Sequence, residues 1–474
     1  MIPAPSRTAT AAPAPDVGAA LPGSVLSIPT TTLPSSHDVG RISSDCNGPS
    51  GRWQRRCPRY ALTVTTAPLP HLRLREPSPE LLELPWGRPL AEWTPDGRRF
   101  RELPIGPSRH LVRFLVTERG LVALKEEPTA IAEREYDVLR HLEDAALPAV
   151  VPMGVAGELG ADAAILVTRY LPNSLQYRLL LSRVPPGPAY LRERLLDAMA
   201  GLLVELHRAG VYWGDCSLAN TLFRRDGNLV QAYLVDAETA ELHPTLSDGQ
   251  REYDLEVLVE NVAYGLADLA AMHDRTDLLD DAFEAAESVR ERYRRLWDEL
   301  TATIEVPVGH DERYQIAARV RRLNELGFAV AEIELEPGPG GRIRMRACVA
   351  NRRFHAGELD RLTGVRALEG QARLLLNDLH EYGAWLEHEE RRSLAADEAA
   401  RRWLTEVYEP ALERLGAVVG PGGDAIQAYC DVLETKWLRS EKAKSDVGLQ
   451  ASIDAYIVSG AVGPEISGAV SATS

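Results

Sequence analysis

The sequence predicts an α+β fold with two lobes, a small β-rich lobe and a helical lobe, followed by an additional mostly helical α+β domain. Short apolar runs separated by turn residues fill 100–125, which is typical of consecutive strands. Apolar residues at helical spacing follow, above all at 190–209. Two alternating runs at 330–335 and 342–349 then flank a Gly- and Pro-rich turn, and further helical patterns come after them.

The overall charge limits the partners that the chain can bind. Of its 474 residues, 45% are hydrophobic and 26% are charged, as in ordinary globular proteins. The formal net charge is −16 at pH 7. Phosphate-rich partners reward net positive charge, so this composition argues against general nucleic-acid binding and against binding to anionic membranes. It is still compatible with a local basic site.

Cysteine usage and hydropathy favour a cytoplasmic protein without a membrane span. The five cysteines are scattered and odd in number, without the spacing of a metal knuckle or a disulfide framework. No apolar run approaches the roughly 20 residues that a membrane helix needs. Prolines interrupt the amino-terminal segment where a secretory signal would need an unbroken apolar run. These prolines are Pro3, Pro5, Pro13 and Pro15.

Composition divides the chain into four segments. Residues 1–77 are rich in Ala, Pro, Ser and Thr without a lasting period, so we expect disorder there, or an upstream start that is not used. A first ordered domain is expected at 78–305, because Ser-Pro-Glu at 78–80 is a helix start signal. A second, α+β domain of unknown function is expected at 306–459. Residues 460–474 are rich in Gly, Ala and Ser and should form a flexible tail.

Lys125 and Glu135 are the first candidates for a functional pair. Lys125 ends the apolar run Val-Ala-Leu-Lys, and a helix is expected at 130–144. On that helix Glu135 falls within the apolar stripe that contains Ile131 and Val138. A buried carboxylate needs a partner, and a strand lysine paired with a helix glutamate is the device that steadies nucleotide phosphates in kinases. The alternative is that Glu135 lies at the edge of the stripe and reaches solvent.

A turn at Gly106 and Ser108 precedes this strand, at the position of a loop that covers nucleotide phosphates. Backbone amides and Ser108 could contact phosphates there, and Arg109 could add positive charge. The turn has one Gly and one Pro, whereas the familiar loop has three glycines. A plain surface turn is an equal alternative.

The stretch 211–238 carries the residues best suited to chemistry. Asp215 and Asn220 lie in a polar loop, a hairpin signal follows, and Asp236 ends the second strand of that hairpin. Phosphoryl transfer mainly requires positioning and charge neutralisation. Asp215 would orient the acceptor hydroxyl and take its proton. Asn220 and Asp236 would supply hard oxygen ligands to the Mg²⁺ ion of bound ATP.

Residues 100–270 resemble the bacterial lipopolysaccharide (Kdo) kinase group, within the protein-kinase-like superfamily. The ordered chain as a whole is similar to a bacterial family in which such a unit is joined to a carboxy-terminal domain of unknown function. The resemblance implies a bilobal protein-kinase-like fold with ATP and Mg²⁺ as cofactors, and it implies no substrate. It rests on Val-Ala-Leu-Lys ending at Lys125, Arg-Glu-Tyr at 134–136, Trp-Gly-Asp at 213–215 with Asn220, and Val-Asp-Ala-Glu at 235–238.

Three departures from the family pattern bear on function. Trp213 stands where these families usually have His, and Gly214 stands where many protein kinases have Arg. Without that Arg, switching by phosphorylation of the activation loop is not expected. Ala237 and Glu238 replace Phe and Gly after the metal-binding Asp. Glu238 could assist the metal beside Asp236, or it could equally be a salt-bridge residue.

The region after Asp236 favours a non-peptide acceptor. Residues 237–253 are few for a peptide-docking segment and lack its Ala-Pro-Glu signal. A small-molecule, glycan-type or lipid-type acceptor is therefore expected. Asp254 should cap the helix that follows it and brace the loop at Asp215.

The leading hypothesis is an ATP- and Mg²⁺-dependent phosphotransferase of the lipopolysaccharide-kinase-like class that acts on a non-peptide hydroxyl. The main alternative is a nucleotide-binding pseudokinase whose carboxy-terminal domain binds a partner, which the altered turn at Gly106 and Trp213 favour. A third interpretation is nucleotidylation on the same fold.

In the carboxy-terminal domain, Arg342, Arg344 and Arg346 alternate with apolar residues, so they should share one face of a strand. A solvated face is the simpler interpretation, and an anion contact is the alternative. Helices are expected at about 369–390, 397–415 and 424–442. Four aromatic residues are expected in the core of this domain. They are Trp385, Trp403, Tyr408 and Trp437.

Overall fold

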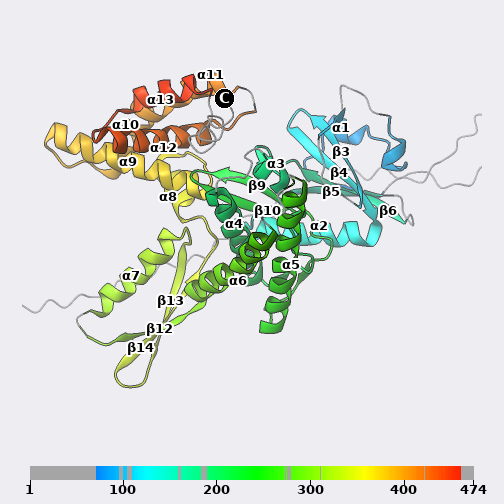
Figure 1. Cartoon of the computed structure of the whole chain (residues 1–474), viewed down its shortest axis with the longest axis horizontal. Helices are drawn as coiled ribbons and strands as arrows, with labels where there is room; N and C mark the ends of the chain where they lie inside the picture. The colour runs from blue at the N-terminus through cyan, green and yellow to red at the C-terminus, as the bar shows by residue number, and fades with distance from the viewer. Residues whose placement is uncertain are drawn as a thin grey trace, which may run out of the picture. The chain divides into compact units, whose positions relative to one another are not determined.

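Figure 1 shows the computed structural model, whose described residues all lie within Thr66–Ser474. The turn expected at Gly106 and Ser108 lies outside the described residues, as do most of the expected amino-terminal extension and carboxy-terminal tail. The structure describes residues 71–94, 100–103, 109–157, 162–182, 189–272, 274, 279–309, 311–420 and 422–460.

A six-stranded antiparallel sheet forms the small lobe. Its strand order is β1-β5-β6-β4-β3-β2. β4 lies between β3 and β6, and Lys125 of β4 pairs with Val112 on one side and Leu166 on the other. Lys125 is therefore held in an interior strand of the sheet. The strands are β1 (His71–Leu74), β2 (Phe100–Arg101), β3 (Leu111–Thr117), β4 (Gly120–Pro128), β5 (Pro152–Gly157) and β6 (Ala163–Arg169).

Strand β1 lies within the segment that the sequence predicts to be disordered. His71 of β1 pairs with Gly157 of β5, inside the segment 1–77 that was expected to be disordered. Burial along β1 alternates between exposed and half-buried residues, and none of them is fully buried. A four-residue strand of this kind leaves too short a period-2 pattern to be distinguished from coil.

The segment 81–93 braces the sheet through its leucines and tryptophans. It contains the short helix α1 (Pro79–Leu82) and a 3₁₀ turn at Leu90–Glu92. Leu90 and Trp93 are buried in an apolar cluster with residues of β3, β4, β5 and β6. The burial of these large side chains fixes the segment on the sheet.

Helix α2 (Thr129–Asp144) follows β4 directly and packs against β4, β5 and β6. Pro128 precedes its first turn, where a missing amide hydrogen costs nothing. The predicted apolar stripe is buried, and Glu135 within it is fully buried as well. The buried residues of α2 are Ala132, Glu135, Tyr136, Val138, Leu139 and Leu142.

The helical lobe is built around α4, whose long apolar face contacts α6, β8 and β10. Two small sheets complete the lobe, one ordered β10-β9-β7 and the other formed by β8 and β11. The predicted hairpin after the Asp215 loop is the pair β9 and β10. The elements are α3 (Tyr177–Ser182), α4 (Ala189–Arg208), α5 (Asp248–Met272), α6 (Leu279–Thr301), β7 (Ser174–Leu175), β8 (Val211–Tyr212), β9 (Thr221–Asp226), β10 (Leu229–Leu234) and β11 (Glu241–Leu242).

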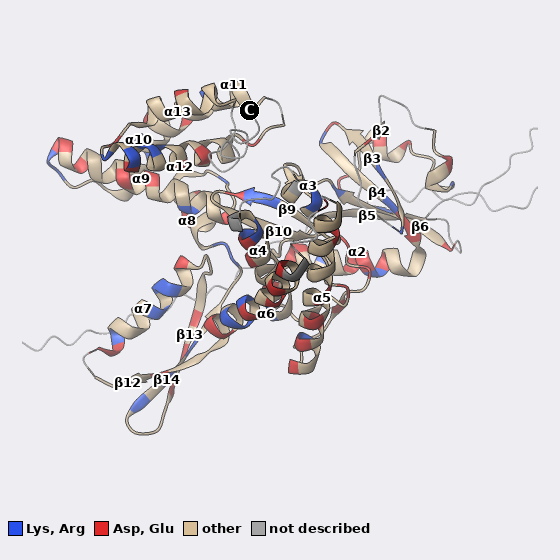
Figure 2. Ribbon diagram, in the orientation of Figure 1, with Lys and Arg blue, Asp and Glu red and all other residues tan. Residues whose placement is uncertain are grey.

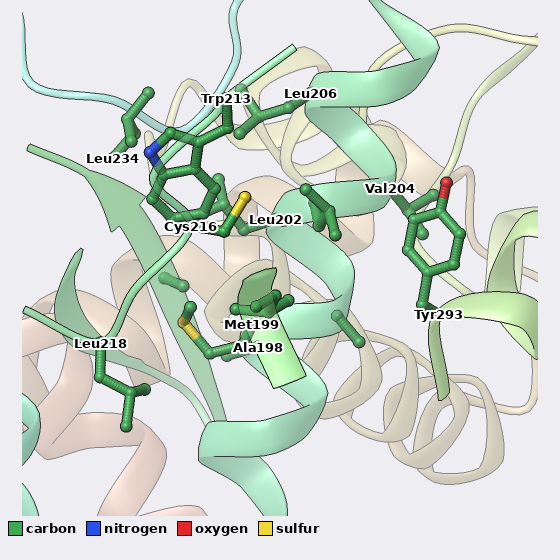
Figure 3. Close-up of a cluster of buried hydrophobic side chains, with 14 of the residues drawn as sticks. Ala198, Met199, Leu202, Val204, Leu206, Trp213, Cys216, Leu218, Leu234 and Tyr293 are labelled. Carbon is green, nitrogen blue, oxygen red and sulfur yellow. The ribbon is translucent and has the colours of Figure 1, made fainter. Parts of the chain in front are cut away.

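The core of the helical lobe gathers around α4. Figure 3 shows Met199, Leu202 and Leu206 of this helix near Trp213 and Cys216 of the following loop. All five side chains are completely buried. The loop that carries the candidate catalytic residues therefore begins with residues that are packed in this core.

The boundary expected at 305/306 cuts through a strand. β12 (Thr303–Pro307) pairs with β14 (Arg342–Val349), which also pairs with β13 (Val330–Pro337). Val306 and Met345 of this sheet, together with Leu323 of α7 (Glu312–Glu325), belong to the same apolar cluster as the helical lobe. The three-stranded sheet thus extends the core of the first domain.

A second, separate apolar core lies in the helices after this sheet. Trp403 and Tyr408 are buried in it, whereas Trp385 is 54% exposed and Trp437 is 62% exposed, so the expectation of a core position was wrong for the last two. Among the described residues, no helix is long and apolar enough to cross a membrane. The helices are α8 (Phe354–Thr363), α9 (Glu369–Glu390), α10 (Ala396–Trp403), a π-helical turn at Leu404–Tyr408, α11 (Glu409–Val419), α12 (Ala425–Ala443) and α13 (Leu449–Val458).

Candidate functional site

The predicted ion pair between β4 and α2 is present. Lys125 Nζ donates a hydrogen bond of 2.8 Å to Glu135 Oε2. The other oxygen of Glu135, Oε1, accepts a 3.0 Å hydrogen bond from the backbone amide of Ala237. Glu135 is thus fully buried with both oxygens bonded, and the alternative of a solvent-facing Glu135 is wrong.

Three carboxylates approach the Lys125 ammonium. Besides Glu135, Asp236 Oδ1 lies 3.1 Å from Nζ and Glu127 Oε2 lies 2.8 Å from it. Burial alone would lower the pKa of Lys125, but attraction to the carboxylates outweighs it and raises the pKa above the usual lysine value. Lys125 therefore stays protonated. Burial, supported by repulsion from Glu127 and Asp236, raises the pKa of Glu135 in spite of the neighbouring ammonium.

Asp215 and Asn220 lie together in the loop between β8 and β9. Asn220 Nδ2 donates hydrogen bonds to the Asp215 backbone oxygen at 3.1 Å and to Asp215 Oδ2 at 3.0 Å. The backbone amide of Asn220 donates to Ser217 Oγ at 3.2 Å. Because the side-chain amide nitrogen faces Asp215, the side-chain carbonyl of Asn220 is directed elsewhere and can serve as an oxygen ligand.

The base of the hairpin joins Asn220 to the segment that carries Asp236. Thr221 pairs with Leu234 at the end of the ladder, and the Val235 amide donates a 3.1 Å hydrogen bond to the Asn220 carbonyl. The chain thus brings Asn220 and Asp236 to the same end of the hairpin. Asp236 in turn contacts Lys125, so the Asp215 loop and the Lys125 cluster are connected through the backbone.

Asp254 braces the loop before Asp215, as predicted, but it does not cap a helix. Its carboxylate accepts hydrogen bonds from the amides of Trp213 at 2.7 Å and Gly214 at 2.8 Å. The expected capping role was wrong because α5 already begins at Asp248 and places Asp254 in its interior. His207 lies 3.1 Å from the same carboxylate, and burial lowers the pKa of this histidine although Asp254 opposes the shift.

The structure explains why Trp and Gly stand at positions 213 and 214. Neither residue disturbs the candidate catalytic residues. The Trp213 indole is fully buried in the core of the helical lobe, so it replaces a histidine as a packing residue (Figure 3). Gly214 has φ +81°, and a Cβ there would meet the Thr239 carbonyl at 3.1 Å. The backbone conformation therefore explains why no Arg stands at this position.

Glu238 contacts a histidine rather than Lys125. Its Oε2 lies 3.0 Å from His110 Nε2, next to the start of β3. Glu127, His110 and Glu238 each offer a ligand atom within 4.8 Å of one another, so they have the residue types and spacing of a cation site. The contact with His110 supports the salt-bridge alternative for Glu238, and assistance to the metal beside Asp236 stays a prediction. Arg109, beside His110, is exposed.

The three arginines of β14 do share one exposed face. Arg342, Arg344 and Arg346 alternate with buried or half-buried residues along the strand. Arg342 forms an ion pair with Glu305 of β12 at 2.9 Å, and Arg346 forms one with Glu334 of β13 at 3.6 Å. These cross-strand pairs favour the solvated face over an anion contact.

Sequence reasoning missed Glu127 and His110 as members of the site. Glu127 is buried, and its Oε2 forms an ion pair with the Lys125 ammonium at 2.8 Å. The period of two along a strand places Glu127 on the same face as Lys125, so this neighbour was detectable. His110 carried no comparable signal, because its contact with Glu238 joins positions 128 residues apart.

Comparisons with known proteins agree with this arrangement in the central part of the chain. Residues 118–276 match the sequence model of the Lipopolysaccharide kinase (Kdo/WaaP) family, and residues 295–460 match that of a domain of unknown function, DUF4032. The lipopolysaccharide core heptose(I) kinase WaaP of Pseudomonas aeruginosa is 29% identical over 105 residues, which cover 21% of this chain and 39% of the relative. The chain thus matches about two fifths of that relative's length.

A solved structure of WaaP in complex with acyl carrier protein is 21% identical and covers 43% of this chain and 89% of that chain, with a TM-score of 0.28. Together with the bilobal α+β architecture, the family match confirms the resemblance and the fold class expected from the sequence. The central part of the chain is therefore similar to the lipopolysaccharide kinase (Kdo/WaaP) family, and the part after it is similar to DUF4032.

Proposed function

We propose that this protein is an ATP- and Mg²⁺-dependent phosphotransferase that acts on a non-peptide hydroxyl. The observation that carries the proposal is the contact of Lys125 with both Glu135 and Asp236. A lysine held between a helix glutamate and a strand-end aspartate is poised to bind nucleotide phosphates beside a metal ligand. The match to lipopolysaccharide kinases supports the same class of reaction.

Each side chain has a role in this proposal. Lys125 binds nucleotide phosphates, and Glu135 fixes the lysine between β4 and the Ala237 amide. Asp215 orients the acceptor hydroxyl and takes its proton. Asn220 and Asp236 hold Mg²⁺ through oxygen atoms.

The donor set fits the metal. Among the described residues, three carboxylates share the Lys125 ammonium, so the site carries surplus negative charge that a divalent cation would neutralise. When bound, Mg²⁺ would neutralise charge on the phosphates. Gly106 and Ser108, which lie outside the described residues, stay in the proposal as candidate phosphate contacts.

The proposed acceptor is a sugar-type or other small hydroxyl compound. Only residues 237–247 separate Asp236 from α5, and β11 within them is paired to β8. This segment is held by the pairing of β11 with β8, and it is too short to bind a peptide strand. The named relative from Pseudomonas aeruginosa is a heptose kinase, which supports a glycan-type acceptor.

The experiment is transfer of label from ATP to the components of a bacterial metabolite and glycan extract. Purified full-length chain is incubated with ATP labelled either at the γ-phosphate or in the adenosine. Label from the γ-phosphate on a non-protein product, absent with Asp215→Asn, is the expected result. Adenosine label on the product would instead indicate nucleotidylation, and nucleotide binding without any transfer would indicate a pseudokinase. The matched control is Glu241→Gln, an exposed acid on the same segment.

A further inference from the structure

The β9–β10 hairpin connects the two proposed metal ligands at its base and the DUF4032 helices at its tip. Asn220 immediately precedes β9, and Asp236 follows shortly after β10. At the other end, the turn at Asp226 and Gly227 is buried against α9 and α12. The paired two-stranded ladder of β9 and β10 links this tip to the base of the hairpin.

Asp226 caps helix α9 from outside that helix. It is 2% exposed, and its two oxygens accept hydrogen bonds from the amides of Gly370 at 2.9 Å and Gln371 at 2.7 Å. These amides belong to the first turn of α9, where free N–H groups and the helix dipole favour a carboxylate. The residue before the helix, Leu368, has no side chain that could cap it, so the hairpin supplies the cap.

Gly227 is clamped by Gln427 of α12. The Gly227 amide donates to Gln427 Oε1 at 2.9 Å, and Gln427 Nε2 donates to the Gly227 carbonyl at 2.9 Å. Beside this clamp, the backbone of the hairpin turn and the backbone of the first turn of α9 approach very closely. A Cβ on Gly370 would lie 2.3 Å from the Asp226 carbonyl, and a Cβ on Gly227 would lie 2.8 Å from the Gly370 carbonyl.

A partly buried ion pair holds the neighbouring residue of β9. Arg225 makes two hydrogen bonds to Asp431 of α12, at 2.9 and 2.6 Å. Asp431 is 3% exposed and also accepts from Gln427 Nε2 at 2.9 Å and from the Tyr456 hydroxyl at 3.3 Å. The basic stretch of β9 is visible in Figure 2, and its other arginine, Arg224, contacts Asp424 at 2.7 Å. Bidentate, charge-assisted contacts of this kind fix orientation as well as distance.

We propose that Gly370, Gln427 and Asp431 of the DUF4032 helices are positioning residues for the Asp215–Asp236 segment of the kinase-like region. By holding the hairpin tip, they set where its base presents Asn220 and Asp236. The DUF4032 helices are then a required part of the phosphotransferase unit and not a separable binding module. This inference rests on the proposed function for the identity of the metal ligands, but the mechanical coupling can be measured without it.

The test compares two substitutions of helical glycine by alanine in the full-length chain. Gly370→Ala places a methyl group against the Asp226 carbonyl, whereas Gly416→Ala in α11 meets no atom within 4 Å. Alanine is otherwise favoured over glycine in a helix, so both changes are matched in propensity. Gln427→Ala is the second variant, because it removes the clamp on Gly227 without adding volume.

Two measurements decide the inference. Hydrogen–deuterium exchange should become faster in peptides covering 215–220 and 235–237 for Gly370→Ala and Gln427→Ala, and stay unchanged for Gly416→Ala. The Mg²⁺ concentration for half-maximal ATP turnover should rise on the order of tenfold in the same two variants, the lower end of the loss that follows when a metal ligand is no longer held in its orientation.

Faster exchange confined to the hairpin tip, with unchanged exchange at 215–220 and 235–237, would overturn the coupling. Faster exchange at the base with an unchanged Mg²⁺ requirement would overturn the positioning role. If the wild-type chain turns over no nucleotide, the proposed function fails, and the exchange measurement still decides whether the DUF4032 helices control this segment.

Discussion

The ammonium of Lys125 lies 3.1 Å from the carboxylate of Asp236, although 111 residues separate the two in the sequence. The same ammonium contacts Glu135 of α2 and Glu127 of β4. One cation thus holds together the sheet, the helix that packs on it and the segment after the hairpin. Its loss should affect both the stability of the fold and the proposed binding of nucleotide.

Lys125→Met should lower the free energy of unfolding by about 3 kcal/mol or more, because it leaves buried carboxylates without their cation. Part of that loss should disappear as the pH is lowered, since protonation removes the uncompensated charge. Urea unfolding at several pH values measures both effects. Adding Glu127→Gln to Lys125→Met should restore part of the stability without restoring ATP binding. Wild-type stability of Lys125→Met at neutral pH would contradict this account of the cluster.

Asp254→Ala should destabilise the loop that carries Asp215. The amides of Trp213 and Gly214 would lose their acceptor, and an unsatisfied buried donor costs about 1–3 kcal/mol. Hydrogen–deuterium exchange of these two amides should accelerate more than exchange of the buried amides of α5. Asp248→Asn at the start of α5, whose side chain is exposed, is the control. Equal protection of both amides in Asp254→Ala and wild type would refute the bracing role.

Glu205 should make the fold less stable as the pH rises from about 4.5 to 7. Burial raises the pKa of this carboxyl to about 7, although Arg352 and Arg208 oppose the shift. The folded state therefore binds more protons than the unfolded state in this window, and stability is greatest below the unfolded-state pKa. Glu205→Gln should flatten the profile and raise the free energy of unfolding at pH 8 by up to about 3 kcal/mol. Chemical unfolding across pH 4–8 tests this, and an unchanged profile would contradict it.

Replacing Arg342, Arg344 and Arg346 together by Gln should change the free energy of unfolding by no more than about 1 kcal/mol, since the observed pairs are exposed. ATP turnover should be unchanged. Weaker binding of a phosphorylated partner by the triple variant would support the anion contact instead of the solvated face. Salt titration of that binding would show its electrostatic origin.

The sequence predicts the elements that have strong periodicity. The stripe on α2 located Glu135 on a buried face, and the alternation on β14 placed the three arginines together. Weakly patterned elements escaped prediction, including β1, β12 and α8, because four to ten residues carry too little periodicity. The helix expected at 397–415 is interrupted by a π-helical turn at Leu404–Tyr408, which no residue type announces.

Contacts between segments that are distant in the chain could not be predicted from the sequence. The order of Lys125, Asp215 and Asp236 along the chain predicts a shared site, but it says nothing about Asp226 meeting the first turn of α9. In the sequence, Asp226 is typical of a turn, and Gly370 is an unfavourable residue within a helix. Only the close approach of the two backbones explains both.

We propose that Asp215 and Asp236 serve different steps of one nucleotide-dependent reaction. The most direct measurement is Mg-ATP binding by calorimetry, together with ATP turnover, for the wild type, Asp215→Asn and Asp236→Asn. We expect Asp215→Asn to bind Mg-ATP as the wild type does while turnover falls by at least about a hundredfold, the lower range for a proton-transferring group. Asp236→Asn should weaken Mg-ATP binding itself. Turnover by Asp215→Asn at the wild-type rate, or Mg-ATP binding that is indifferent to Asp236→Asn, would contradict the account.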